Sequence, residues 1–233
     1  MNLDHLLKRP SPYQGLDLSD CPTGLKWGYG SADPILARII RELQPQTIIE
    51  IGSYEGGSAT YMGQAVKDAG LDTSIICVDT WLGSPEHSLQ DGFADALHAR
   101  NGYPRLYFRF LGNMKLAGLE DIVTPLPNTS ENGAVILTAL DIKAQLIFVD
   151  AAHEYAPVLR DLEDYWPLLA DKGVIVGDDY HPSWPGVVQA AHEFARANSL
   201  PLFGKQGKFV LQKGGAVGLN TLAEEGFSQV HFD

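Results

Sequence analysis

The chain has few cysteines and few basic side chains, and each scarcity excludes a class of protein. Its 233 residues include two cysteines, Cys21 and Cys77, and Cys77 lies in an apolar run at 74–79. A disulfide framework is therefore not expected, and a reducing cytoplasm is the expected location. Lys and Arg number 17 against 29 Asp and Glu, which gives a formal net charge of -12. This charge argues against nucleic acid or an anionic membrane as a partner, because both are bound through clustered cations.

Long hydrophobic runs are missing as well. The sequence has no uninterrupted apolar run of about 18 residues, the length that spans a bilayer. Its first residues, MNLDHLLKRPSPYQG, lack the apolar core of a signal peptide. We therefore expect no membrane partner and a small-molecule ligand, and the oligomeric state, a homo-oligomer included, is left open.

What the sequence does contain is a regular alternation of short apolar runs and helix-length segments. We expect strands at 47–51, 74–79, 122–126, 146–149, 174–176, 200–203 and 208–212. β-branched runs separated by helices are typical of buried parallel strands, and the last two runs, separated by Gly204 and Gly207, predict an antiparallel hairpin. The predicted fold is α/β, a doubly wound, mostly parallel seven-stranded sheet with an antiparallel C-terminal hairpin.

The regular pattern defines a main domain with less regular segments around it. Residues 1–30 are rich in Pro, Gly and Asp and are expected to form an arm or lid over the main domain at 31–213. Within that domain, 80–110 is long for a connection, and its aromatic content favours an ordered insertion, a candidate substrate lid. The remaining 214–233 form a tail.

Acidic side chains end two of the predicted strands. Asp150 follows the run at 146–149, with His153 three residues later, and the pair Asp178 and Asp179 follows the next run. Because parallel strands end at one edge of a sheet, these side chains should converge there. Carboxylates suit a hard cation, Mg²⁺ or alternatively Mn²⁺, whereas zinc would call for Cys or clustered His. The plainer alternative is that single acids cap helices, but two adjacent caps would repel without gain.

A glycine-rich loop follows the first predicted strand in the sequence IIEIGSYEGGSA. Gly52 and Gly56 stand where the strand turns into a helix, which allows close backbone approach to a ligand. The spacing is not the dinucleotide fingerprint GxGxxG. Glu50 lies in the strand, where a carboxylate needs a partner, and Asp79 ends the second strand, where an acid can accept both ribose hydroxyls. A tight turn and a helix cap would explain each piece alone, but in this order the pieces favour a nucleoside cofactor.

These motifs resemble those of a known family. IEIGSYEGGS followed by VDTW is similar to the cofactor loop and acidic strand end of class I S-adenosylmethionine-dependent methyltransferases. FVDAAHEY with GVIVGDDY resembles the metal-dependent O-methyltransferases, more the macrolide-sugar and antibiotic-pathway enzymes than catechol O-methyltransferase. The resemblance covers about 45–197.

The resemblance implies roles for individual residues. Glu50, Gly52, Ser53 and Gly56 would line the methionine end of S-adenosylmethionine, and Asp79 would bind its ribose. The turn at Asn128, Thr129 and Ser130 would lie against the adenine. Asp150, Asp178 and Asp179 would hold the metal, and His153 would be the catalytic base. Two residues depart from the catechol pattern: Asp179 stands where that group has an amide, and His153 where it has a lysine.

The expected function is Mg²⁺-dependent transfer of a methyl group from S-adenosylmethionine to a hydroxyl of a sugar or other natural product. An alternative is a metal-dependent hydrolase that uses the same carboxylate and histidine cluster. A third is a cofactor-binding protein without catalysis. His181, just beyond Asp179, ranks below His153 as a base.

Overall fold

The structure is a computed structural model. It describes residues 6–21, 23–24, 32–91, 94–215 and 217–232. Parts of the expected arm, at 1–5, 22 and 25–30, lie outside these ranges. No helix in the described ranges is both long enough and apolar enough to cross a membrane.

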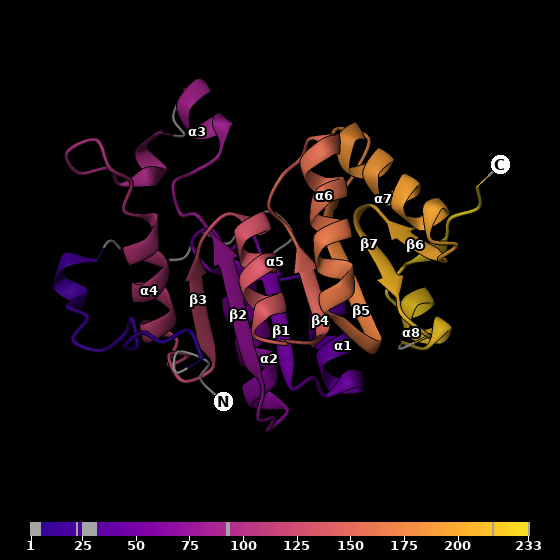
Figure 1. Ribbon diagram of the computed structural model, residues 1–233, viewed down its shortest axis with the longest axis horizontal. Helices are drawn as coiled ribbons and strands as arrows, with labels where there is room; N and C mark the ends of the chain where they lie inside the picture. Colours follow the sequence, from indigo (N-terminus) through magenta and orange to yellow (C-terminus); the bar gives the residue numbers. More distant parts are fainter. Residues whose placement is uncertain (1–5, 22, 25–31, 92–93, 216, 233) are drawn as a thin grey trace.

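The described residues form eight strands in one sheet, in the order β3-β2-β1-β4-β5-β7-β6-β8 (Figure 1). The strands are β1 (Thr47–Ile51), β2 (Ser74–Asp79), β3 (Val123–Pro127), β4 (Ala144–Val149), β5 (Leu169–Tyr180), β6 (Leu202–Lys205), β7 (Gly207–Gln212) and β8 (Ser228–Gln229). The first five strands pair in parallel, and β7, β6 and β8 add to this sheet in antiparallel pairs. The predicted α/β class and antiparallel C-terminal hairpin are confirmed.

The predicted count of seven strands was wrong by one. The additional strand β8 lies in the segment predicted as a tail and pairs with β6 through Phe203–Gln229 and Gly204–Ser228. A strand of two residues contains one step of the alternation between the two sides of a sheet, so it carries no periodic signal.

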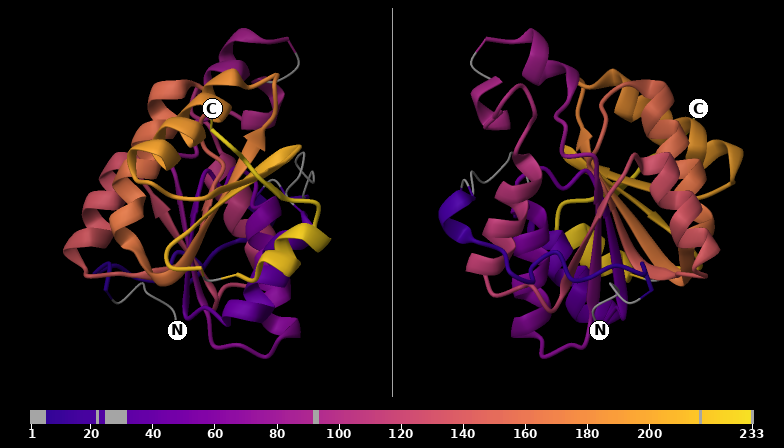
Figure 2. Two further views of the ribbon diagram at one scale, coloured as in Figure 1. Left: turned by 90° about the vertical axis from the view of Figure 1, so that its right-hand side faces the viewer. Right: turned by 60° about the vertical axis from the view of Figure 1, so that its left-hand side comes forward.

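Helices cover both faces of the sheet (Figure 2). The helices are α1 (Pro34–Leu43), α2 (Gly57–Asp68), α3 (Pro85–Leu89), α4 (Leu106–Leu116), α5 (Ser130–Ala139), α6 (Tyr155–Tyr165), α7 (Pro185–Ala197) and α8 (Leu219–Glu224), with single turns at η1 (Leu18–Asp20), η2 (Ala94–Leu97) and η3 (Trp166–Leu168). α1, α2, α4 and α8 share one apolar core with the sheet, and α5, α6 and α7 share the other. The sheet is therefore buried on both sides, as its continuous apolar strands require.

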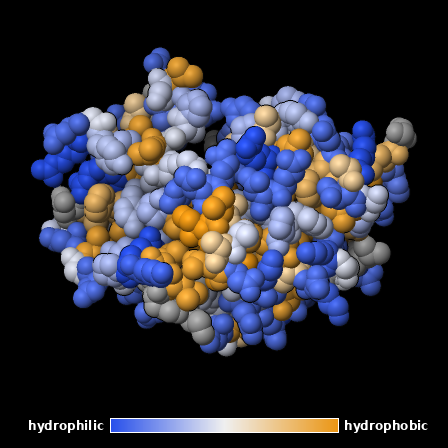
Figure 3. Space-filling model, viewed as in Figure 1, coloured by the Kyte–Doolittle hydropathy of each residue, from blue (hydrophilic) through white to orange (hydrophobic). Residues whose placement is uncertain are grey.

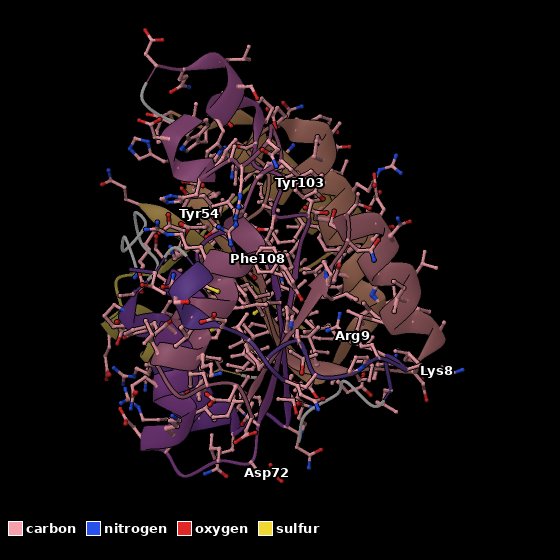
Figure 4. All side chains as sticks on the ribbon, turned by 90° about the vertical axis from the view of Figure 1, so that its left-hand side faces the viewer. Lys8, Arg9, Tyr54, Asp72, Tyr103 and Phe108 are labelled. Atoms are coloured by element: carbon pink, nitrogen blue, oxygen red, sulfur yellow. The ribbon has the colours of Figure 1, made fainter. Side chains whose placement is uncertain are left out.

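The N-terminal segment runs along the open edge of β3. The Tyr13 hydroxyl donates to the carbonyl of Val123 at 3.0 Å, and the Arg9 guanidinium donates to the carbonyl of Pro125. Figure 4 shows Lys8 and Arg9 beside this part of the sheet. Side chains thus satisfy carbonyls that a further strand would otherwise pair, which protects the edge against association.

Candidate active site

The glycine loop packs directly against the strand end that carries Asp150. Gly52 has φ +85°, and a Cβ there would stand 2.0 Å from the carbonyl oxygen of Asp150. The Gly52 amide donates to Val78 at 2.9 Å, and the Asp150 amide donates to Ile51 at 2.8 Å. A side chain at Gly52 would therefore separate β1 from β4, so the loop and the predicted acid cluster meet only because this residue is glycine.

Asp79 holds the loop from the end of β2. Its carboxylate accepts hydrogen bonds from the amides of Ser53 at 2.9 Å, Tyr54 at 2.8 Å and Trp81 at 2.7 Å. The Trp81 indole in turn donates to the Tyr54 carbonyl at 2.8 Å. Asp79 is thus fixed at the carboxyl edge beside the glycine loop, as expected from the sequence. Its binding of a ribose stays a prediction.

Glu50 lies beneath the loop and is fully buried. Its carboxylate accepts from the Ser53 hydroxyl at 2.5 Å, the Cys77 thiol at 3.2 Å and the Ser58 hydroxyl. Burial raises the pKa of Glu50, and the three hydrogen bonds oppose that rise because they favour the charged form. The carboxylate therefore ties β1, the loop and α2 together, which makes it a residue that positions the loop.

A buried ion pair between Arg109 on α4 and Glu55 of the glycine loop, which was not predicted from the sequence, holds the far side of the loop. Arg109 Nε lies 3.0 Å from Glu55 Oε1, with the two side chains 7% and 1% exposed. The Asn113 amide donates to the Glu55 carbonyl at 2.9 Å, and Arg109 Nη2 donates to the carbonyl of Gly24 at 2.6 Å. Arg109 also contacts His98. One arginine therefore joins the loop, the N-terminal segment and the insertion. The position of Arg109 within the apolar pattern of this helix is the signal in the sequence that could have indicated the ion pair.

The turn before α5 lies next to Asp79. The Asn128 amide donates to the Asp79 carbonyl at 3.0 Å, and Thr129 caps α5 by accepting from the Asn132 amide at 3.2 Å. Beneath the turn, Asp161 on α6 is 3% exposed, and burial raises its pKa to about 6 against the hydrogen bond that it receives from Ser130. This places the turn at 128–130 beside the end of β2 that carries Asp79. The contact of Thr129 and Ser130 with an adenine stays a prediction.

At the other end of the site, Asp178 forms a buried ion pair with Lys208. Asp178 is 7% exposed, and its Oδ1 accepts from Lys208 Nζ at 2.5 Å and from the Asp179 amide at 2.7 Å. The two residues of the pair stand opposite each other in the β5–β7 register. Asp178 Oδ2 is buried and has no hydrogen-bond partner among the described residues. Lys208 was not predicted as a site residue, although a lysine in the apolar run KFVL needs an acidic partner when buried.

Asp179 and Trp184 hold His153 between them. His153 Nε2 lies 2.9 Å from Asp179 Oδ2, and the imidazole stacks on the Trp184 ring with centroids 4.1 Å apart and an interplanar angle of 23°. The hydrogen bond to Asp179 raises the pKa of His153. Asp179 has φ +57°, a conformation that costs a non-glycine residue about 1 to 2 kcal/mol. The expected proximity of His153 to the acids is thus present, and its specific partner is Asp179.

The short helix α3 of the insertion lies near both ends of the site. The His87 ring is 5.5 Å from the Tyr54 ring of the glycine loop, and the Glu86 charge contributes to the raised pKa of His153, less than Asp179 does. Figure 1 shows α3 beyond the carboxyl ends of the parallel strands, and Figure 4 shows Tyr54, Tyr103 and Phe108 on that side of the molecule. Helix α3, within the described part of the insertion, therefore lies next to the site.

The predicted gathering of Asp150, Asp178 and Asp179 around one ion is not seen in the present arrangement. Among the described residues, no three His, Cys, Asp or Glu side chains form a group that could hold a metal ion. The carboxylate oxygens of Asp150, Asp178 and Asp179 are nevertheless the type of ligand that a hard cation prefers. Burial and the charges of Asp178 and Asp179 raise the pKa of Asp150, and Asp178 Oδ2 is a buried acceptor that a cation would satisfy.

Two curated proteins of undefined function share part of the sequence. "Uncharacterized protein R132" of Acanthamoeba polyphaga mimivirus is 28% identical over 135 residues, which cover 58% of this chain and 51% of the viral protein. "Uncharacterized protein y4gI" of Sinorhizobium fredii is 29% identical over 146 residues, 60% of this chain and 14% of that protein. The matches thus span about half of the first relative and a small part of the second.

Solved O-methyltransferases share the fold. The Bacillus cereus O-methyltransferase in complex with SAH has a TM-score of 0.55 at 16% identity, covering 90% of this chain and 93% of that one. NovP, an O-methyltransferase, has a TM-score of 0.56 at 17% identity, covering 79% and 80%. CalS11, a TDP-rhamnose 3'-O-methyltransferase of calicheamicin biosynthesis, has a TM-score of 0.51 at 18% identity, covering 76% of each chain.

The sequence also matches a family directly. Residues 49–180, which include most of β1, the glycine loop, Asp79, Asp150, His153 and both acids at the end of β5, match the Methyltransferase domain family Methyltransf_24. The match covers more than half of the 233 residues. The chain therefore belongs to this family of methyltransferases.

Proposed function

We propose that the chain transfers a methyl group from S-adenosylmethionine to a hydroxyl of a sugar or other natural product. The observation that carries the proposal is the contact at Gly52, which joins the glycine loop to the strand end bearing Asp150. The loop that would bind the nucleoside methyl donor is thereby adjacent to the strand end that would carry the acidic reaction centre. The complex of the Bacillus cereus enzyme with SAH supports the donor, and the activity of CalS11 on TDP-rhamnose supports the acceptor class.

The residues around the loop would bind the donor. Asp79, at the edge of β2, would accept from the ribose, and Ser53 and Gly56 would lie along the methionine end, with Thr129 and Ser130 beside the adenine. Gly56 has φ +88°, and a Cβ there would stand 2.4 Å from the terminal methyl of Met114 and 3.1 Å from the Phe110 ring, so a side chain at this point would be strained and crowded. Glu50 would act from below by holding Ser53.

Asp150, Asp178 and Asp179 would hold Mg²⁺ or Mn²⁺, and the ion would lower the pKa of the acceptor hydroxyl when bound. His153 would take the hydroxyl proton as the acceptor oxygen bonds to the methyl carbon and the carbon–sulfur bond of the donor breaks. Asp179 and Trp184 hold the imidazole for this task. Orientation of the two reactants would supply much of the rate.

The segments around the site would select the acceptor. We propose 31–213 as the methyltransferase domain, 80–110 as a lid over the acceptor, 1–30 as an arm and 214–233 as a tail that adds β8 to the sheet. The proximity of His87 to Tyr54 supports the lid. A hydrolase built on the same acids would leave the glycine loop without a task.

Mass spectrometry of hydroxyl acceptors incubated with S-adenosylmethionine tests the proposal. We expect the mass of one CH₂ to be added to an acceptor, and a chelator to abolish the gain. Transfer that continues in the chelator would contradict the metal component alone. Turnover of an ester or phosphate without any nucleoside would instead favour the hydrolase.

A further inference from the structure

Lys208 is a buried cation that the methyl-transfer scheme leaves without a task. It is 2% exposed, it projects from β7 toward the end of β5, and its ammonium lies 2.5 Å from Asp178 Oδ1 and 5.7 Å from the centroid of the Phe148 ring. A lysine is buried at a cost unless it is paired. The pairing with Asp178 is therefore what keeps this charge inside the protein.

The pair divides the two oxygens of Asp178 between different roles. Oδ1 receives both the Lys208 ammonium and the Asp179 amide, whereas Oδ2 is buried and has no hydrogen-bond partner in the described part of the chain. Asp178 can thus offer one free oxygen to an incoming ion. That ion would approach a carboxylate whose other oxygen is already paired with the positively charged ammonium of Lys208.

We propose that Lys208 is the resident counter-cation of Asp178, which stabilises the acid cluster without a divalent ion and weakens the binding of one. The inference rests on the proposed function only for the identity of the metal ligands. Like charges that share one carboxylate repel most strongly in a buried site, where solvent screens them little. Lys208 is accordingly a positioning residue that acts through Asp178. By linkage, a bound ion should weaken the Lys208–Asp178 pair as much as the lysine weakens the binding of the ion.

Substitution of Lys208 by Met, with Mn²⁺ alone as the probe, tests this inference. Lys208→Met keeps an unbranched apolar chain and removes the charge. Lys205→Met is the matched control, because Lys205 lies on the same hairpin and pairs with Asp33 at 2.8 Å. We measure Mn²⁺ affinity by titration calorimetry and electron paramagnetic resonance, and thermal stability with and without the ion.

For Lys208→Met we expect the dissociation constant for Mn²⁺ to fall at least tenfold and the melting temperature in chelator to drop, with recovery when Mn²⁺ is added. The control should keep the affinity of the parent protein. Should Lys208→Met be unfolded in chelator, Lys208→Gln, which retains a donor without the charge, is measured instead and should also bind Mn²⁺ more tightly.

An unchanged or weaker affinity in both Lys208 variants would overturn the inference, as would a lack of Mn²⁺ binding in the parent protein and all variants. Calorimetry with S-adenosylhomocysteine on the same preparations separates this failure from a failure of the proposed function. Nucleoside binding without any effect of Lys208 on Mn²⁺ would leave the methyltransferase site intact and reject only the role of Lys208.

Discussion

His153 owes its orientation to contacts on two sides. The carboxylate of Asp179 fixes one ring nitrogen, and the Trp184 ring covers a face of the imidazole. His181, the other histidine near this strand end, instead accepts from the Ser183 amide at 3.1 Å through its own Nδ1. The two histidines can therefore be separated by experiment.

Replacement of His153 by Gln should reduce kcat/KM for methyl transfer by about 10²- to 10⁴-fold, the usual contribution of a general base. Binding of S-adenosylhomocysteine, measured by calorimetry, should stay as in the parent protein. His181→Gln is the control and should retain most of the activity. Equal losses in both variants would argue that His153 is not the base.

Substitution of Gly52 tests the contact between the glycine loop and the strand end that carries Asp150. Gly52→Ala places a Cβ 2.0 Å from a backbone oxygen at φ +85°, so we expect the free energy of unfolding to fall by about 3 kcal/mol or more. Gly70→Ala is the matched control: its φ is +64°, and no atom lies within 4 Å of the added Cβ. It should cost about 1 kcal/mol in urea unfolding. Similar losses at both positions would contradict a specific clash at Gly52.

The positions of the acids and glycines at strand ends could be predicted because each follows a strand with a clear apolar pattern. Arg109 and Lys208, the two buried cations that hold Glu55 and Asp178, were missed. A basic residue in a helix or strand is usually exposed, so its burial follows only from the pairing of distant segments.

At the scale of elements, α6 supports the turn that begins α5. The Asp161 carboxylate accepts from Ser130, and the Tyr165 hydroxyl donates to the Ser130 carbonyl at 2.9 Å. Burial raises the pKa of Asp161 to about 6 from its ordinary value of 3.8. Protonation therefore favours the folded state, and stability should fall as pH rises from 3.8 to about 6, then level off.

Asp161→Asn should remove this pH dependence. As pH rises from about 4 to 7, the parent protein should lose on the order of 2 kcal/mol of unfolding free energy relative to the variant, which has no carboxyl group to titrate at this position. Urea unfolding across this range measures it, and the difference between the two proteins cancels the titration of all other groups. A constant difference would show that Asp161 keeps an ordinary pKa in the folded protein.

The N-terminal segment and β3 form a second testable contact. Tyr13→Phe removes the donor to the Val123 carbonyl and should lower the unfolding free energy by about 1 kcal/mol, because that carbonyl loses its partner inside the protein. Tyr103→Phe, at a side chain that is 67% exposed, should change little. Equal melting temperatures for parent and Tyr13→Phe would show that the contact does not stabilise the edge.

Among the elements, those with long apolar runs were predicted best. The expected strands at 47–51 and 74–79 coincide with β1 and β2, and the hairpin shifts by only one or two residues. The short elements α3, η2 and β8 were not predicted. Each has only a few residues, which is too short to show the hydrophobic periodicity of a helix or a strand. The sequence shows where the sheet lies more clearly than what lies over it.

At the scale of the whole molecule, the three layers bring both parts of the site to one edge of the sheet. Helices occupy both faces of the sheet, and α3 stands beyond the carboxyl ends of the parallel strands. On the face shown in Figure 3 the surface is mostly hydrophilic, apart from apolar areas such as the one over α5, a helix in which Val135 is 68% exposed. Its position on the outer face of a helix separates it from the site.

Binding of a nucleoside methyl donor by the glycine loop and Asp79 is the step on which the proposed reaction depends. Calorimetric titration with S-adenosylhomocysteine tests it without knowledge of the acceptor. We predict saturable binding of one nucleoside per chain in the parent protein, and an affinity lowered at least tenfold in Asp79→Asn, about 1.4 kcal/mol, with the fold retained. Absence of saturable binding in the folded parent protein, or unchanged affinity in Asp79→Asn, would contradict this role of the loop and Asp79.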